Sequence, residues 1–176
     1  MKFTPTKIAG VWIVDMERHE DERGWFARSW CAEEFAKHGL DSNLSQCSVS
    51  FNRRRGTLRG MHYQVAPHAE TKLVRCTHGA IFDVALDLRP ASPSFKQWVG
   101  AELTAKSGRA LYIPEGCAHG FQTLEGESEV FYQMTGAFHP ASARAVRWND
   151  PAFLINWPLP EVILSGKDKS VLDSTF

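Results

Sequence analysis

The stretch that decides the fold is Leu58-Arg59-Gly60-Met61-His62-Tyr63-Gln64, an apolar, strand-like run that carries an arginine and a histidine. In a regular strand, side chains alternate between two faces, so Arg59 and His62 would lie on opposite faces. A β-bulge at Gly60 would instead bring both side chains into the same cavity. Imidazole is the usual protein base near neutral pH, so His62 is a candidate base, and a hydrogen-bonded core histidine is the alternative.

Further runs of apolar or alternating residues predict strands on both sides of this stretch. They lie near residues 10–17, 25–30, 44–51, 71–77, 80–88, 97–104, 109–113, 119–124, 128–134 and 144–148, with one short helix near 31–38. We interpret residues 19–24 as a polar turn, and His78-Gly79 and Gly126-Glu127 as hairpin turns. Short strands at this spacing, with almost no helix between them, predict a β-sandwich or barrel.

Length predicts one domain, or at most two small ones, with enough chain for a core of its own. We expect a single domain over residues 1–176, with N-terminal strands and a C-terminal tail that packs on the barrel. The formal net charge is zero, so neither nucleic acid nor an anionic membrane is expected as a partner. The four cysteines show no CxxC spacing and indicate thiols in a reducing compartment. With no signal peptide and no long apolar run, the sequence predicts a cytoplasmic protein.

A second informative stretch is Tyr112-Ile113-Pro114-Glu115-Gly116-Cys117-Ala118-His119-Gly120-Phe121, where Pro-x-Gly predicts a tight turn between two strands. It resembles the second sequence motif of the cupins, jelly-roll barrels in which this histidine often joins an earlier His-x-His pair and a glutamate around a metal. The earlier motif is missing here, because His62 has no partner at ligand spacing. The expected fold class is therefore all-β, a cupin-type jelly-roll (double-stranded β-helix) barrel with a few short peripheral helices. We expect it to work without metal or any other cofactor.

Taken in order, the motifs of the chain resemble those of a narrower family, the dTDP-4-dehydrorhamnose 3,5-epimerases. The matching segments are residues 21–24, 46–50, 56–64, 72–76, 83–89, 113–121, 132, 147–151 and 164–168. The resemblance implies a nucleotide-linked 4-keto-6-deoxyhexose as substrate and a homodimer in which N-terminal strands cross to the partner. It also implies inversion at C3, C5 or both, in which a base removes the proton next to the C4 ketone and an acid reprotonates the opposite face.

The same resemblance implies roles for individual residues. His62 is the implied base, Tyr132 the implied acid, and Lys72 lies near the C4 oxygen. Two carboxylates remain candidates for orienting His62: Asp168 by the resemblance, and Asp83 because a charge among apolar strand residues needs a reason. Further substrate contacts are implied for Arg23, Gln46, Ser48, Arg59, His119, Phe138 and Lys167, with the two arginines on the diphosphate and Phe138 against the nucleobase.

Each assignment has a structural alternative. Without the resemblance, Tyr132 fits a core tyrosine, Lys72 an exposed strand-end lysine, Asp168 a solvated tail residue and Phe138 a core residue that closes the barrel end. Asp83 fits a buried structural carboxylate equally well. At the level of the whole protein, the alternatives are a metal-dependent cupin oxygenase or isomerase and a non-catalytic cupin that binds a sugar nucleotide.

Four positions depart from the family pattern. Arg28 and Ala143 stand where the pattern has glutamates, Ser48 replaces an asparagine, and Phe138 replaces a tyrosine. The implied catalytic residues are intact, whereas the implied substrate contacts are altered. The sequence therefore leaves open which sugar nucleotide is bound and which carbons are inverted.

Overall fold

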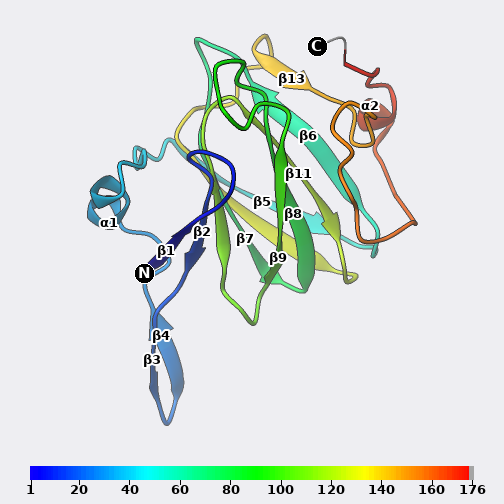
Figure 1. Ribbon diagram of the computed structural model, residues 1–176. Helices are drawn as coiled ribbons and strands as arrows, with labels where there is room; N and C mark the ends of the chain where they lie inside the picture. The colour runs from blue at the N-terminus through cyan, green and yellow to red at the C-terminus, as the bar shows by residue number, and fades with distance from the viewer. Residues whose placement is uncertain (175–176) are drawn as a thin grey trace.

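Most of the strands belong to two antiparallel sheets in the computed structural model, which describes residues 1–174 (Figure 1). In spatial order, the larger sheet contains β1 (Lys2–Pro5), β2 (Trp12–Asp15), β10 (Ala110–Ile113), β7 (Lys72–His78), β12 (Ser128–Met134) and β5 (Gln46–Asn52). The smaller sheet contains β13 (Ala143–Ala145), β6 (Leu58–Gln64), β11 (Cys117–Thr123), β8 (Ala80–Asp87) and β9 (Trp98–Thr104). This architecture confirms the predicted all-β class.

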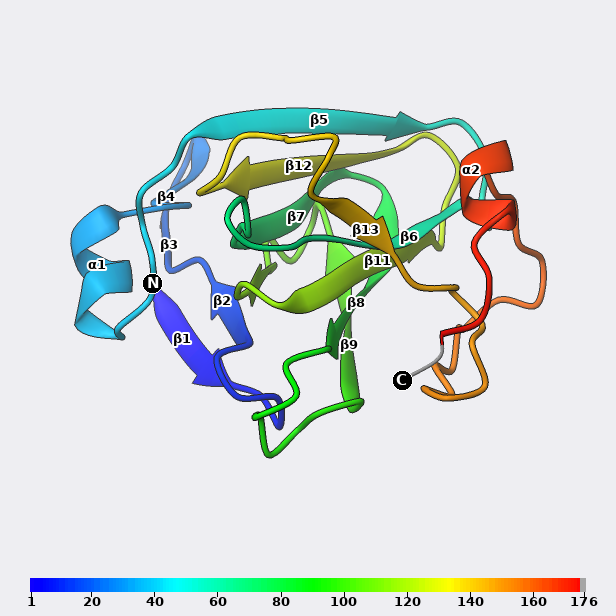
Figure 2. The same ribbon diagram turned by 90° about the horizontal axis from the view of Figure 1, so that it is seen from above.

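The remaining elements lie outside these two sheets. Strands β3 (Arg18–Asp21) and β4 (Gly24–Ala27) pair only with each other, and the helices are α1 (Ala32–Lys37) and α2 (Gly166–Lys169). Figure 2 shows α2 at one end of the barrel, far from α1. Among the described residues, neither helix approaches the length and apolar character that a membrane span requires.

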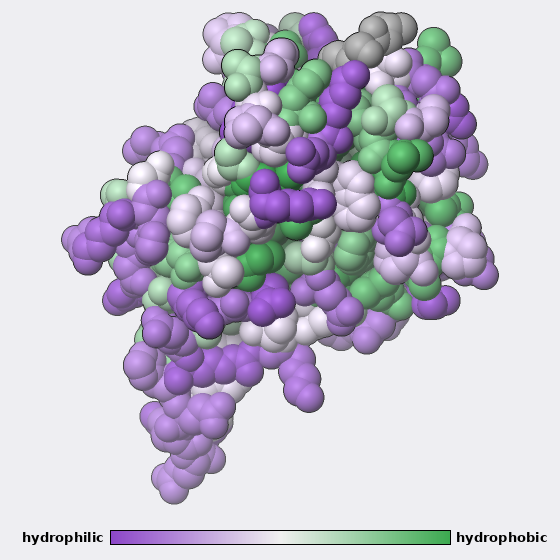
Figure 3. All heavy atoms as spheres, viewed as in Figure 1, coloured by the Kyte–Doolittle hydropathy of each residue, from purple (hydrophilic) through white to green (hydrophobic). Residues whose placement is uncertain are grey.

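The segment predicted as a polar turn is in fact a projecting hairpin. Residues Arg18–Asp21 and Gly24–Ala27 form its two strands, and this arm extends away from the barrel (Figure 1). In the view of Figure 3, its surface is mostly hydrophilic. The strand predicted near 25–30 overlaps β4, but alternation did not identify β3, because a ribbon that covers no core of its own does not need an apolar face.

The two predicted hairpin turns were also wrong. Strand β7 belongs to the larger sheet and β8 to the smaller, so the chain changes sheets at His78-Gly79; it changes back between β11 and β12, at Gly126-Glu127. Gly79 has φ +74°, and a Cβ atom there would lie 2.6 Å from the Ser128 side chain. The glycine therefore permits a sharp corner between sheets, where only a small residue with positive φ fits.

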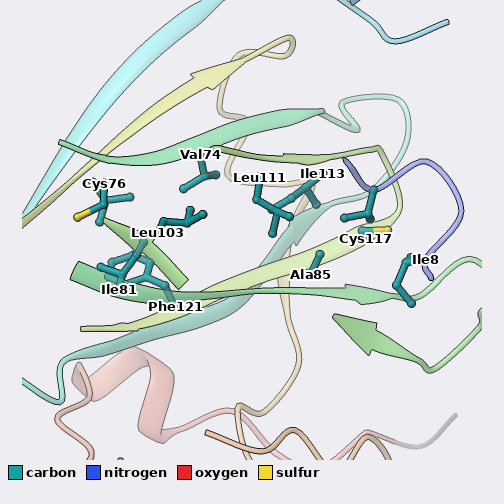
Figure 4. Packing of buried hydrophobic residues seen from close by; sticks show 12 residues of the cluster. Ile8, Val74, Cys76, Ile81, Ala85, Leu103, Leu111, Ile113, Cys117 and Phe121 are labelled. Carbon is teal, nitrogen blue, oxygen red and sulfur yellow. The ribbon is translucent and has the colours of Figure 1, made fainter. Parts of the chain in front are cut away.

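The main core lies between the two sheets. Val74, Leu111 and Val130 come from the larger sheet, Ile81 and Phe121 from the smaller, and all five are fully buried (Figure 4 shows the cluster). Alternation supplies this packing, because every second residue of each strand points inward. Tyr132 packs against the same cluster, so the core continues directly into the site described next.

Two segments outside the sheets cover their outer faces. Val146 and Phe153 pack with Met61 and other buried residues on the outside of the smaller sheet. Phe35 of α1 covers part of the larger sheet. On β5 of the larger sheet, Val49 and Phe51 are not covered: their side chains are 59% and 52% exposed.

Candidate active site

A β-bulge in β6 places Arg59 and His62 on the same face. Two residues separate them in β6, whereas one residue separates their partners Phe121 and His119 in β11. Gly60 lies in this bulge with φ +149°, and a Cβ atom there would lie 2.6 Å from the backbone of β11. The structure thus confirms the predicted bulge, and with it the shared orientation of Arg59 and His62.

A cavity of about 560 Å³ opens between the two sheets. Strands β5, β7 and β12 of the larger sheet supply one wall, and β6, β11 and β13 of the smaller sheet supply the other. The structure brings ten of the twelve predicted site residues to this cavity: Gln46, Ser48, Arg59, His62, Lys72, His119, Tyr132, Phe138, Lys167 and Asp168. Asp83 and Arg23 do not line it.

His62 is paired with Asp168. Its Nε2 lies 2.7 Å from Asp168 Oδ1, and the Asp168 side chain is only 5% exposed. Asp168 is held in place by α2, where its backbone N–H donates to Ser165 Oγ. Burial acts to raise the pKa of Asp168, but His62, Ser165 and Lys167 together outweigh it, and the net effect lowers the pKa. Asp168 is therefore an ionised partner of the imidazole and not a solvated tail residue.

The other candidate carboxylate, Asp83, is bonded to a different histidine. Asp83 Oδ1 lies 2.7 Å from His119 Nε2, and the two side chains are 0% and 5% exposed. Asp83 is thus not the partner of His62 in this structure. Burial raises the pKa of Asp83, and His119 acts in the opposite direction without cancelling the effect.

Tyr132 enters the cavity from the sheet opposite His62. Its ring meets His119 edge-on, with ring centroids 5.9 Å apart and planes at 81°. Burial, followed by the negative charge at Asp83, raises the pKa of the Tyr132 phenol. Tyr132 therefore stays protonated at neutral pH, which is the state that a proton donor needs.

Lys72 forms an ion pair that sequence reasoning missed. Its Nζ lies 2.7 Å from Glu70 Oε1, and the two side chains are 10% and 7% exposed. This burial rules out the interpretation of Lys72 as an exposed strand-end lysine. An ammonium group has three N–H donors, so the bond to Glu70 leaves two for a ligand in the cavity. A carboxylate two residues before a lysine was the only signal for this pair in the sequence.

Within residues 1–174, three cations on the cavity wall form no salt bridge with a carboxylate: Arg59, Arg144 and Lys167. Arg59 Nε donates to Asn52 Oδ1, and Arg144 donates to backbone carbonyls. Their charges therefore remain available to an anionic ligand. The contribution of Arg144 to the cavity was not predicted, because β13 is short and its position depends on pairing with β6.

Phe138 lies at the edge of the cavity and not in the core. Its side chain is 58% exposed, and its backbone N–H donates to Gln46 Oε1. Gln64, another residue whose role was missed, donates to the Ala137 carbonyl and accepts from the His139 N–H. Two glutamine side chains thus hold the loop that carries Phe138.

Arg23 lies outside the cavity of its own chain. It is at the tip of the β3–β4 arm, its side chain is 85% exposed, and it pairs with Asp21 at 2.6 Å. The described residues contain no group of three or more His, Cys, Asp or Glu side chains placed to hold a metal ion.

A cavity between two sheets, with a histidine–aspartate pair on one wall and a partly buried tyrosine on the other, defines an acid–base enzyme built on a jelly-roll barrel. The sequence profile described as dTDP-4-dehydrorhamnose 3,5-epimerase matches residues 5–174. The chain therefore belongs to the dTDP-4-dehydrorhamnose 3,5-epimerase family, a family of isomerases. The predicted resemblance and the predicted enzyme class are confirmed.

The sequences and structures of similar proteins align with this chain over nearly its whole length. The dTDP-4-dehydrorhamnose 3,5-epimerase of Sinorhizobium fredii is 41% identical over 171 residues, covering 97% of this chain and 88% of its own length. The crystal structure of the Elizabethkingia anophelis enzyme superimposes with a TM-score of 0.95 at 35% identity, covering 98% of this chain and 96% of that one. The Legionella pneumophila enzyme was solved in complex with dTDP-4-keto-L-rhamnose; its TM-score is 0.91 at 37% identity, with coverage of 97% and 90%. These structures confirm the predicted cupin-type jelly roll.

Proposed function

We propose that the chain epimerises a dTDP-linked 4-keto-6-deoxyhexose at C3, C5 or both. One observation carries this proposal: His62 and Tyr132 line the same cavity from opposite sheets. Inversion at carbon requires a base on one face of the sugar ring and an acid on the other. A substrate held between the two walls would present one face to each residue.

The residues of the cavity supply each step of the reaction. The His62 ring nitrogen that is not bonded to Asp168 takes the proton from the carbon next to the ketone, and the C–H electrons move into an enolate. Lys72 stabilises the negative oxygen of this enolate with its remaining donors. Tyr132 then delivers its proton to the opposite face of the same carbon. Solvent removes the proton from His62 and restores that of Tyr132, so no net proton is consumed.

The nucleoside diphosphate is proposed to bind the cationic part of the cavity. Arg59, Arg144 and Lys167 carry positive charge there outside any described salt bridge, and guanidinium groups match phosphate oxygens well. Phe138 offers an exposed ring face to the nucleobase, for which no hydroxyl is needed. The sugar-nucleotide complex of the Legionella enzyme supports this class of ligand.

We also propose a homodimer in which the β3–β4 arm reaches the partner. Arg23 lies on that arm, so crossing would bring it to the partner's cavity and its proposed phosphate contact. Trp25 and Phe26 on the arm and Val49 and Phe51 on β5 supply exposed apolar surface for the contact. In the apolar run at residues 11–14, Val11 and Val14 are buried within their own chain. A monomeric mass by light scattering at micromolar concentration would contradict this dimer.

The proposed location is the cytoplasm, since all four cysteines are free thiols and two of them are buried. The altered positions Arg28, Ser48, Ala143 and Phe138 leave the choice of sugar nucleotide to experiment.

The function is tested by incubation with dTDP-4-keto-6-deoxyglucose in deuterated water, followed by NMR at C3 and C5. We expect deuterium at one or both carbons together with inversion. The His62→Ala variant, run in parallel, separates enzymatic from spontaneous exchange. Failure of the wild-type enzyme to incorporate deuterium above the rate of this variant would overturn the proposal.

A further inference from the structure

The Asp83–His119 pair is a second carboxylate–imidazole pair, and the mechanism above gives it no role. It resembles the His62–Asp168 pair in chemistry and in its 2.7 Å bond, but differs in burial: the His62 side chain is 43% exposed, and that of His119 only 5%. A substrate can therefore reach His62 more easily than His119. The second pair lies deeper, between the cavity and the core.

The proposed acid contacts this pair from the opposite sheet. His119 belongs to β11 of the smaller sheet and meets the ring of Tyr132, on β12 of the larger sheet, edge-on at 5.9 Å. Asp83 is close enough for its charge to act on the Tyr132 phenol, as does the charge of Arg59 with the opposite sign. The pair is thus coupled to Tyr132 by contact and by charge.

Donation of the Tyr132 proton creates a problem that this arrangement addresses. The proton leaves for the substrate carbon, and the O–H electron pair stays behind as a phenolate in a buried site. A lone buried carboxylate nearby would oppose that negative charge. A proton shared within the hydrogen bond between Asp83 and His119 would offset the carboxylate charge and lower the cost of forming the phenolate.

We propose that Asp83 is a positioning residue for the acid half of the reaction: it orients His119 beside Tyr132 and shares a proton with it, so that the phenolate can form. This inference rests on the proposed function. The second oxygen of Asp83 has no hydrogen-bond partner within residues 1–174, so almost all of its bonding is directed to His119. A carboxylate that served only to hold the fold would be expected to have both oxygens bonded.

The test compares two rates in the same sample: deuterium exchange, which needs only the base, and inversion, which also needs the acid. Asp83→Asn preserves the shape of the side chain and removes its charge. We expect exchange within about three-fold of wild type and inversion reduced about ten-fold or more, which is the pattern expected for Tyr132→Phe and not for His62→Ala. In the Tyr132→Phe background, Asp83→Asn should cause no further loss of inversion, because residues that act as one unit are not additive.

The matched control is Asp87→Asn, which alters the other fully buried aspartate of β8 at a position outside the cavity. It should leave the ratio of inversion to exchange unchanged. A second variant, His119→Gln, keeps Asp83 and should lower the same ratio, so the inference stays testable if Asp83→Asn folds poorly.

Three outcomes would overturn the inference. Equal losses of exchange and inversion in Asp83→Asn would mean that Asp83 serves the base or the fold as a whole. An unchanged ratio, with both wild-type rates intact, would remove this inference and leave the proposed function standing. A wild-type enzyme that neither exchanges nor inverts would overturn both.

Discussion

Strand β8 buries two aspartates four residues apart, Asp83 and Asp87, and their surroundings differ sharply. Both side chains have no exposed surface. Asp87 accepts hydrogen bonds from Arg89, Ser92 and Ser94 on both of its oxygens, whereas Asp83 accepts one bond from a histidine. Burial acts to raise the pKa of both; the bonds to Asp87 reverse the effect and lower its pKa, whereas that of Asp83 stays raised.

This difference separates a carboxylate that holds the fold from one that serves a site. Asp87 ties the loop after β8 to the strand, and its charge is matched by Arg89. Asp83 keeps an unbonded oxygen inside the barrel, which costs stability and needs a functional reason. Burial alone would have grouped the two residues together; the number and type of bonding partners distinguishes them.

The largest expected effect is that of His62→Ala, which removes the proposed base from the active site. Loss of the base should lower deuterium exchange by about two to four orders of magnitude. His62 is partly exposed and contributes no core packing, so the melting temperature should stay within a few degrees of wild type. NMR exchange rates and a melting curve on the same preparation measure both quantities. A variant that unfolds would show that His62 serves the fold.

The next largest effect is expected at Asp87, the carboxylate that holds the fold. Asp87→Asn should reduce the free energy of unfolding by about 2–4 kcal/mol, because buried donors lose a charged acceptor. A carboxylate whose pKa is lowered in the folded chain stabilises the fold above its ordinary pKa, and this contribution is lost as pH falls through the lowered pKa. The stability difference between wild type and variant should therefore shrink below about pH 4. Denaturant titrations at pH 7 and pH 3 would show this, and a constant difference would contradict it.

A smaller effect is expected at the exposed ring of Phe138. Phe138→Ala should weaken dTDP binding about ten-fold, because a base–aromatic stack contributes roughly 1–3 kcal/mol. Phe138→Tyr, the matched control, keeps the ring and should bind as wild type does. Since the ring is 58% exposed, thermal stability should hardly change. Calorimetric titration beside a melting curve tests this, and a loss of stability with unchanged binding would mean that the ring is structural.

The smallest effect on stability is expected for Asp83→Asn, in contrast to the loss of stability expected for Asp87→Asn. A carboxyl group with a raised pKa favours folding when it is protonated, and that contribution is lost as pH rises through its folded pKa. At pH 7 its replacement by a neutral amide should leave the free energy of unfolding unchanged or raise it. If a denaturant titration showed the same loss of unfolding free energy for Asp83→Asn as for Asp87→Asn, the proposed difference between the two aspartates would be contradicted.

Local patterns in the sequence predicted much of this fold. Alternation located the main strands, and Gly60 in a run that carries both Arg59 and His62 pointed to the bulge. The hairpin predictions failed because they depend on non-local contacts: nothing near Gly79 indicates that the next strand joins the other sheet. The partner of a carboxylate is equally non-local, since tertiary packing assigns Asp168 to His62 and Asp83 to His119. The likeness to the family supplied roles that spacing alone could not give.

The proposed inversion requires that the base and the acid face the substrate from opposite walls, and the Tyr132→Phe variant tests this requirement. The measurement is NMR of dTDP-4-keto-6-deoxyglucose in deuterated water, with exchange and inversion followed in one sample. We expect exchange through His62 to continue near the wild-type rate while inversion falls by about ten-fold or more. Inversion by Tyr132→Phe at the wild-type rate would contradict it, because the opposite wall would then not supply the proton.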